Sequence, residues 1–180
     1  MIDSKAQQIL ETTFLDAISM LGLPPIPYSF RYEKIGGRFQ TMDNAEEVDN
    51  VNRIVYINED WANQMVKVFE YDLHYMMAHE ARHAYQEIMM RLLQSGRQTK
   101  EPAALIVSWI DNKQHYVRNQ GGATLRPYHR QPMEVDADAF ANFYVLVKRI
   151  GQARIPEDSD DLVTQRLKEI AAQYGAQIRG

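Results

Sequence analysis

The residues with the clearest chemical potential are two histidines and a glutamate in the HExxH motif His79-Glu80-Ala81-Arg82-His83. On a helix, positions i and i+4 lie on the same face, so both imidazoles point at one place, where each can bind a zinc ion at roughly 2.0 Å. Glu80 is rotated by about 100° from His79 and flanks such an ion without binding it. The motif therefore predicts a Zn²⁺ site with a carboxylate beside it.

The chemistry expected of such a site is hydrolysis. A zinc ion lowers the pKa of its bound water to near neutrality and polarises a scissile carbonyl. Glu80 would accept the proton of this water and pass it to the leaving amine. The motif thus predicts zinc-dependent cleavage of a peptide bond, with Glu80 as the general base.

A catalytic zinc site also needs a third protein ligand and one open position. The stretch after His83 has Gln86 at the third position and lacks the glycine and third histidine of metzincins. The chain contains no cysteine, so the ligand must be a histidine or a carboxylate. Glu134 is the best candidate, because Asp138 follows one helical turn later and can accept the free ring N–H of a ligating histidine. Asp136 could replace Glu134 as the ligand, but it lies two positions from either residue and so faces off their stripe.

Together the two motifs resemble the gluzincin pattern HExxH…ExxxD, shared by thermolysin-like enzymes and small ImmA/IrrE-type metallopeptidases, which are often encoded on phages or mobile elements. The resemblance covers roughly residues 53–150. It implies a site of five residues: the zinc ligands His79, His83 and Glu134, the catalytic base Glu80, and Asp138 as hydrogen-bond partner of a ligand. It also implies a peptide or protein substrate aligned by an edge strand, and Arg53–Asn58 has the position of that strand.

Other polar side chains near the second motif leave alternatives open. Tyr128 or His129 can donate a hydrogen bond to the oxyanion of a transition state, or can simply pack in a loop. His115 and Tyr116 fall at the end of a helical pattern that could line a cleft or the core, and we expect core packing. His74 is neither three nor four residues from His79, so we expect an ordinary surface or boundary histidine.

Helical periodicity accounts for most of the chain. It predicts helices over residues 4–21, 59–70, 72–95, 101–119, 132–150 and 158–174. Ser4 is available to cap the first of these. HExxH lies inside the third helix and ExxxD at the start of the fifth, so the two motifs are expected on separate helices.

Strand signals are few. Phe30 and Tyr32 alternate with charged residues over 28–34, and Gly36-Gly37 precede an extended stretch at 38–42, which predicts a hairpin. Residues 43–51 and 119–127 resemble loops. The expected fold class is α+β, a mostly helical zincin-like domain with a small sheet, hairpin plus edge strand, beside the active-site helix.

Length and charge narrow the functional classes. The 180 residues suit a single domain over 1–180, with helices 4–21 and 158–174 added to the 53–150 core. Twenty Lys and Arg against 24 Asp and Glu give a net charge of −4 with both signs interspersed, so nucleic acid and membrane partners are not expected. The N-terminus has no apolar signal core, which favours a cytoplasmic protein. Oligomeric state is left open.

A second functional class fits the same motifs. The chain can hold zinc without proteolysis and act as a binding module through protein–protein contacts. The presence of Glu80 argues against this alternative, because only the hydrolytic function needs a base beside the metal. A metal-free helical structural protein is a third possibility.

Overall fold

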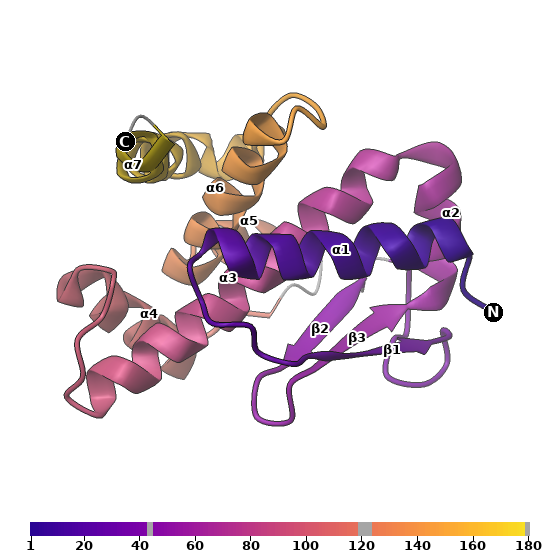
Figure 1. Cartoon of the computed structure of the whole chain (residues 1–180), viewed down its shortest axis with the longest axis horizontal. Coiled ribbons are helices and arrows are strands. Elements are labelled where there is room, and N and C mark those ends of the chain that lie inside the picture. The colour runs from indigo at the N-terminus through magenta and orange to yellow at the C-terminus, as the bar shows by residue number, and fades with distance from the viewer. Residues whose placement is uncertain (43–44, 119–123, 179–180) are drawn as a thin grey trace. The chain divides into compact units, whose positions relative to one another are not determined.

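The computed structural model describes residues 1–42, 45–118 and 124–178 (Figure 1). The described chain is mostly helical and contains one small mixed sheet, so the predicted α+β class is confirmed. It divides into two compact units, Met1–Ala84 and Tyr85–Gly180. Helix α3 (Glu70–Gln94) contributes to both units. The single domain expected over 1–180 stays a prediction.

The first unit combines the sheet with helices whose starts are set by capping side chains. Its other elements are α1 (Ser4–Met20), β1 (Ser29–Glu33), β2 (Glu46–Asp49), β3 (Ile54–Asn58) and α2 (Glu59–Val68). The Asp3 carboxylate accepts hydrogen bonds from the amides of Lys5 and Ala6, so Asp3, not Ser4, caps α1. Asn58 does the same for α2.

The sheet has the order β1-β3-β2, with β1 parallel and β2 antiparallel to the central strand β3 (Figure 1). The predicted hairpin is therefore wrong: residues 38–42 form no strand, and Phe39 is buried in the core. The predicted loop 43–51 contains β2, and the strand expected at the edge lies in the centre. The reason is burial, since the continuous apolar run of β3 is stable only with a neighbour on each side.

The two faces of the sheet differ in polarity. Pairing places Val48 opposite Val55 and Phe30 opposite Val55, so these side chains share one face. Helix α1 packs on this face, where the ring of Phe14 lies 5.8 Å from that of Phe30. On the other face, the Arg38 guanidinium stacks 3.7 Å from the Tyr56 ring centroid. The first face is therefore the core face of the unit.

The second unit is helical where it is described. Besides the end of α3 it contains α4 (Ala103–Gln114), α5 (Leu125–His129), α6 (Pro132–Val147), the 3₁₀ helix η2 (Glu157–Ser159) and α7 (Asp160–Ile178). Helix α4 ends five residues earlier than the predicted 119, which leaves Tyr116 outside it. Of the predicted loop 119–127, residues 119–123 lie outside the described chain and 125–127 belong to α5.

Asn112, on α4, fixes the start of α6. Its side-chain amide donates to Gln131 at 2.9 Å, and its carbonyl oxygen accepts from the amide of Met133 at 3.0 Å. The first amides of a helix lack intrahelical partners, and the bond from the Met133 amide to Asn112 satisfies one of these amides in α6. The contact holds the first turn of α6, which carries Glu134, against α4.

A buried polar cluster joins the helices of the second unit. Arg166 of α7 donates to Asp136 of α6 at 2.7 Å and to Glu101 at 3.4 Å. Asp136 also accepts from Gln86 at 2.8 Å, and Glu101 from Tyr85 at 3.2 Å. Both carboxylates are thereby compensated although their side chains are only 1% exposed.

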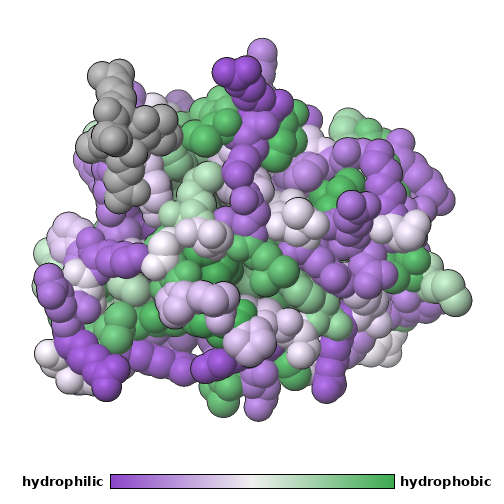
Figure 2. Space-filling view, viewed as in Figure 1, coloured by the Kyte–Doolittle hydropathy of each residue, from purple (hydrophilic) through white to green (hydrophobic). Residues whose placement is uncertain are grey.

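Hydrophilic residues cover much of the face shown in Figure 2, with apolar residues between them. The exposed large apolar side chains include Val68 and Phe69 at the end of α2, and Leu146 and Val147 at the end of α6.

Among the helices of residues 1–42, 45–118 and 124–178, none is long and apolar enough to cross a membrane.

Candidate metal centre

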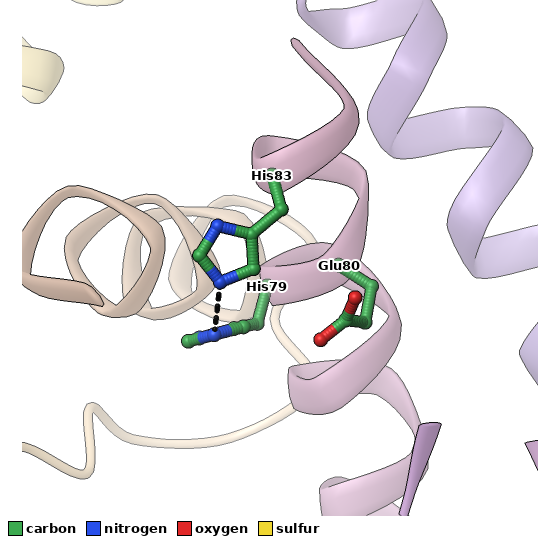
Figure 3. A group of neighbouring side chains, drawn as sticks. All are labelled: His79, Glu80 and His83. Carbon is green, nitrogen blue, oxygen red and sulfur yellow. Dashed lines mark hydrogen bonds between the residues drawn. The ribbon is translucent and has the colours of Figure 1, made fainter. Parts of the chain in front are cut away.

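Helix α3 carries the HExxH motif with one face anchored in the core. Leu73, Met77 and Ala81 of this helix are fully buried. The adjoining face presents His79, Glu80 and His83 together (Figure 3). His79 is buried at 6% exposure, whereas Glu80 and His83 are half-buried. The helical spacing of the motif is thus realised as a compact cluster at the edge of the core.

The two imidazoles face each other with their Nε2 atoms. Nε2 of His79 and Nε2 of His83 lie 2.9 Å apart, with ring centroids 4.6 Å apart and the planes nearly perpendicular (Figure 3). One ligand atom from each histidine and one Glu80 oxygen all lie within 4.8 Å of one another. These three residues can therefore hold a metal ion.

The geometry of the two nitrogens fits a tetrahedral metal with a small adjustment. Nitrogens bound at roughly 2.0–2.1 Å in tetrahedral geometry are about 3.3 Å apart. The observed 2.9 Å separation of the Nε2 atoms is a few tenths of an ångström shorter. A modest rotation of either imidazole about its side-chain bonds supplies the difference.

Two tyrosines extend the histidine row along α3. The rings of Tyr71 and Tyr75 stack at 6.0 Å, and the Tyr75 ring lies 6.5 Å from that of His79. Tyr71, Tyr75, His79 and His83 follow one another at intervals of four residues, so successive members are neighbours on the helix surface. The group of His79, Glu80 and His83 is thereby continued by an aromatic strip toward the N-terminus of the helix.

A further acidic residue near the motif, Glu46, was missed by the sequence reasoning. It is the first residue of β2, and both oxygens of its carboxylate are buried without a hydrogen-bond partner. Burial raises the pKa of Glu46 well above its usual value, the negative charge of Glu80 raises it further, and His79 lowers it. Glu46 therefore belongs to the electrostatic surroundings of the HExxH motif.

A signal for Glu46 was present in the sequence. It occupies a core-face position two residues before Val48 and opposite Ile57, where alternation along a strand predicts an apolar side chain. A carboxylate that breaks such a pattern without an evident structural gain marks a functional or strained site. Recognising it requires knowing that residues 46–49 form a strand.

The remaining predicted site residues lie in the second unit. Glu134 is in the first turn of α6 and is 1% exposed, and its Oε1 accepts a 2.7 Å hydrogen bond from the Tyr116 hydroxyl. Tyr116 is therefore not the core residue that the helical pattern indicated, because it lies beyond the end of α4 and is 40% exposed. Asp138 is buried one turn after Glu134. Their metal-related roles stay predictions.

The candidates for oxyanion stabilisation occupy α5. Nδ1 of His129 lies 2.8 Å from the Asp158 carboxylate, a contact that joins α5 to η2. The Tyr128 ring packs edge-on against the rings of Tyr116 and His129. Packing thus accounts for both residues, and their role in a transition state stays a prediction.

Asp136, the alternative ligand position, accepts hydrogen bonds from Gln86 and Arg166.

No model of a known protein family matches this chain, and neither a curated protein nor a solved structure matches it.

Proposed function

We propose that this chain is a zinc-dependent peptidase. The observation that carries the proposal is the convergence of His79 Nε2 and His83 Nε2 at 2.9 Å with a Glu80 oxygen beside them. Two imidazoles and no thiolate suit zinc among the common metals, and a flanking carboxylate is what a hydrolytic site needs.

The residues divide the work by their chemistry. His79 and His83 would hold the ion through their Nε2 atoms as neutral imidazoles. A zinc ion supplies Lewis acidity toward a carbonyl and lowers the pKa of water. Glu80 accepts a proton from the attacking water and delivers it to the leaving amine, so that the peptide is released as a neutral amine and a carboxylic acid.

The third ligand is proposed to be Glu134, on the basis of the resemblance to the HExxH…ExxxD pattern. Asp138 is proposed to accept the free ring N–H of a ligating histidine and so fix its orientation. The substrate strand is proposed to align along β2, which is an edge strand of the sheet, in place of the central strand β3. An edge offers unpaired backbone groups to an extended peptide.

The experiment that tests this function separates metal binding from catalysis. Zinc per chain is measured after dialysis for the wild type, His83→Gln, Glu134→Gln and Glu80→Gln. We expect about one zinc in the wild type and in Glu80→Gln, and loss of high-affinity zinc in the other two. Hydrolysis of a peptide library by Glu80→Gln should fall by about 10²- to 10⁴-fold, the contribution of a general base.

Each result has a clear consequence. Wild-type activity in zinc-loaded Glu80→Gln contradicts the assignment of the base. Full-affinity zinc in Glu134→Gln removes this residue from the ligand set. Full zinc occupancy with no cleavage of any library peptide favours the alternative function, a zinc-holding binding module that acts through protein–protein contacts.

A further inference from the structure

The carboxylate of Glu46 has a fixed position in the first unit. Its strand is registered by pairing with Ile57, and the amide of Asn58 donates to the Ala45 carbonyl at 2.8 Å immediately before it. The Asn58 side chain also donates to the Thr41 carbonyl at 3.1 Å. Glu46 is therefore held by backbone pairing on a strand that starts at the Asn58 cap of α2.

The surroundings of this carboxylate are unfavourable for an isolated anion. Its face of the sheet is formed by apolar side chains such as Val48 and Ile57. Both carboxylate oxygens are buried and accept no hydrogen bond. A buried acceptor without a donor costs free energy, and a second carboxylate nearby, Glu80, adds repulsion. An arrangement of this kind is stabilised when a positive charge arrives.

Glu46 does not belong to the group of side chains that could ligate a metal ion. Within the described chain, the group whose ligand atoms lie within 4.8 Å of one another consists of His79, Glu80 and His83 and does not include Glu46. A metal ion held by those three residues would not satisfy the two Glu46 oxygens, which still lack hydrogen-bond donors. A second molecule that enters beside Glu80 can supply them. Under the proposed function this molecule is the substrate.

We propose that Glu46 binds a positively charged group of the substrate, an ammonium or a guanidinium, close to the bond that Glu80 helps to cleave. The group's N–H donors satisfy the two Glu46 oxygens in a charge-assisted pair. It belongs either to a free peptide amino terminus or to a lysine or arginine side chain. This specificity rests on the proposed function for the identity of the substrate, but the binding step itself needs no hydrolysis.

The test measures binding in a chain that cannot turn the substrate over. Zinc-loaded Glu80→Gln is incubated with four peptide pools that contain either lysine or norleucine at one fixed position and carry either a free or an acetylated amino terminus. Affinity selection followed by mass spectrometry gives the enrichment of each pool. We expect the cationic pools to be enriched about tenfold or more over the acetylated norleucine pool, as a charge-assisted hydrogen bond provides.

Two further variants assign the effect to Glu46. Adding Glu46→Gln should reduce the enrichment to about the level of the neutral pool. Glu47→Gln is the matched control, because Glu47 is the neighbouring glutamate on the opposite, exposed face and pairs with Arg38 at 3.0 Å. Glu47→Gln makes the same chemical replacement one residue away and should leave the enrichment intact. Loss on acetylation identifies the terminal ammonium, and loss on lysine replacement identifies the side chain.

The outcomes separate this inference from the proposed function. Equal recovery of all pools, recovery of none, or enrichment that survives Glu46→Gln overturns the role of Glu46 even if the wild type cleaves peptides. Glu46-dependent enrichment without cleavage by the wild type supports the cation site and contradicts the peptidase. Thermal melting of Glu46→Gln guards against misfolding, and we expect its midpoint to equal or exceed that of the parent chain.

Discussion

The hydroxyl of Tyr116 donates a 2.7 Å hydrogen bond to Oε1 of Glu134, joining a 40% exposed tyrosine to a fully buried carboxylate. The tyrosine lies beyond the end of α4, and its segment is held by Gln131. The side chain of Gln131 accepts from the Val117 amide at 2.7 Å and donates to the Val117 carbonyl at 2.9 Å. The predicted third metal ligand is thus oriented from outside its own helix.

The first prediction concerns this pair. Tyr116→Phe keeps the ring and removes the donor, so we expect a loss of about 1–2 kcal/mol in the free energy of unfolding, measured with urea. If Glu134 binds zinc, the same variant weakens zinc affinity by about tenfold or more, because the carboxylate loses a hydrogen bond that orients it. A double-mutant cycle with Glu134→Gln isolates the coupling, and strictly additive effects would refute an interaction.

The buried cluster around Arg166 gives a second prediction. Arg166→Met removes the guanidinium that pairs with the buried carboxylates of Asp136 and Glu101, which should cost about 3–5 kcal/mol. The matched control is Arg91→Met, which breaks an exposed pair with Glu87 and should cost less than about 1 kcal/mol. Both values come from urea unfolding at neutral pH. Similar losses for the two variants would show that burial does not strengthen the Arg166 cluster.

The third prediction concerns pH. Nδ1 of His74 lies 2.8 Å from the Thr13 hydroxyl, and burial lowers the pKa of His74 while the charge of Glu70 opposes this shift. The unfolded state, with a pKa of about 6.5, therefore takes up the proton more readily than the folded state. The associated stability is fully present above about pH 6.5 and is lost as pH falls from there through the lower folded pKa.

His74→Gln should remove this component. We expect the unfolding free energy of the metal-free variant to decline less than that of the metal-free wild type between pH 8 and pH 5. The comparison is made in chelator, so that binding of ions to His79 and His83 does not contribute. Identical pH profiles of the two proteins would contradict the assignment to His74.

A fourth prediction uses two helix ends with the same geometry. After α3, Gly96 has φ +69° and the Arg97 amide donates to Leu92 at 2.9 Å; after α6, Arg149 has φ +56° and the Ile150 amide donates to Val145 at 2.9 Å. Both are left-handed helix stops, which favour glycine.

Arg149→Gly should therefore stabilise the protein by about 1 kcal/mol, and Gly96→Ala should destabilise it by a similar amount. A Cβ added at Gly96 meets no atom within 4 Å, so backbone conformation alone determines the loss. Thermal and urea unfolding of both variants provide the measurement. A shift of the same sign in both would rule out the conformational explanation.

The fold illustrates which elements local patterns can predict. The 3.6-residue period identified α1, α3 and α6, because a helix buries one stripe of its own sequence and needs no knowledge of its neighbours. The sheet was predicted poorly. The pairing of Phe30 with Val55 joins segments 25 residues apart, and nothing within either strand specifies its partner. The acidic strand β2 was mistaken for a loop for the same reason.

The sequence by itself determined the cluster of potential metal ligands: the spacing of His79, Glu80 and His83 on one helix is enough to bring their ligand atoms within 4.8 Å. Only the tertiary structure decided that Glu46 is buried near the charge of Glu80, that Tyr116 reaches Glu134, and that Asp136 is committed to Arg166. The physical reason is the separation along the chain of the residues that interact. Helical geometry fixes the direction of side chains a turn apart, whereas the environment of a carboxylate depends on which distant segments pack around it.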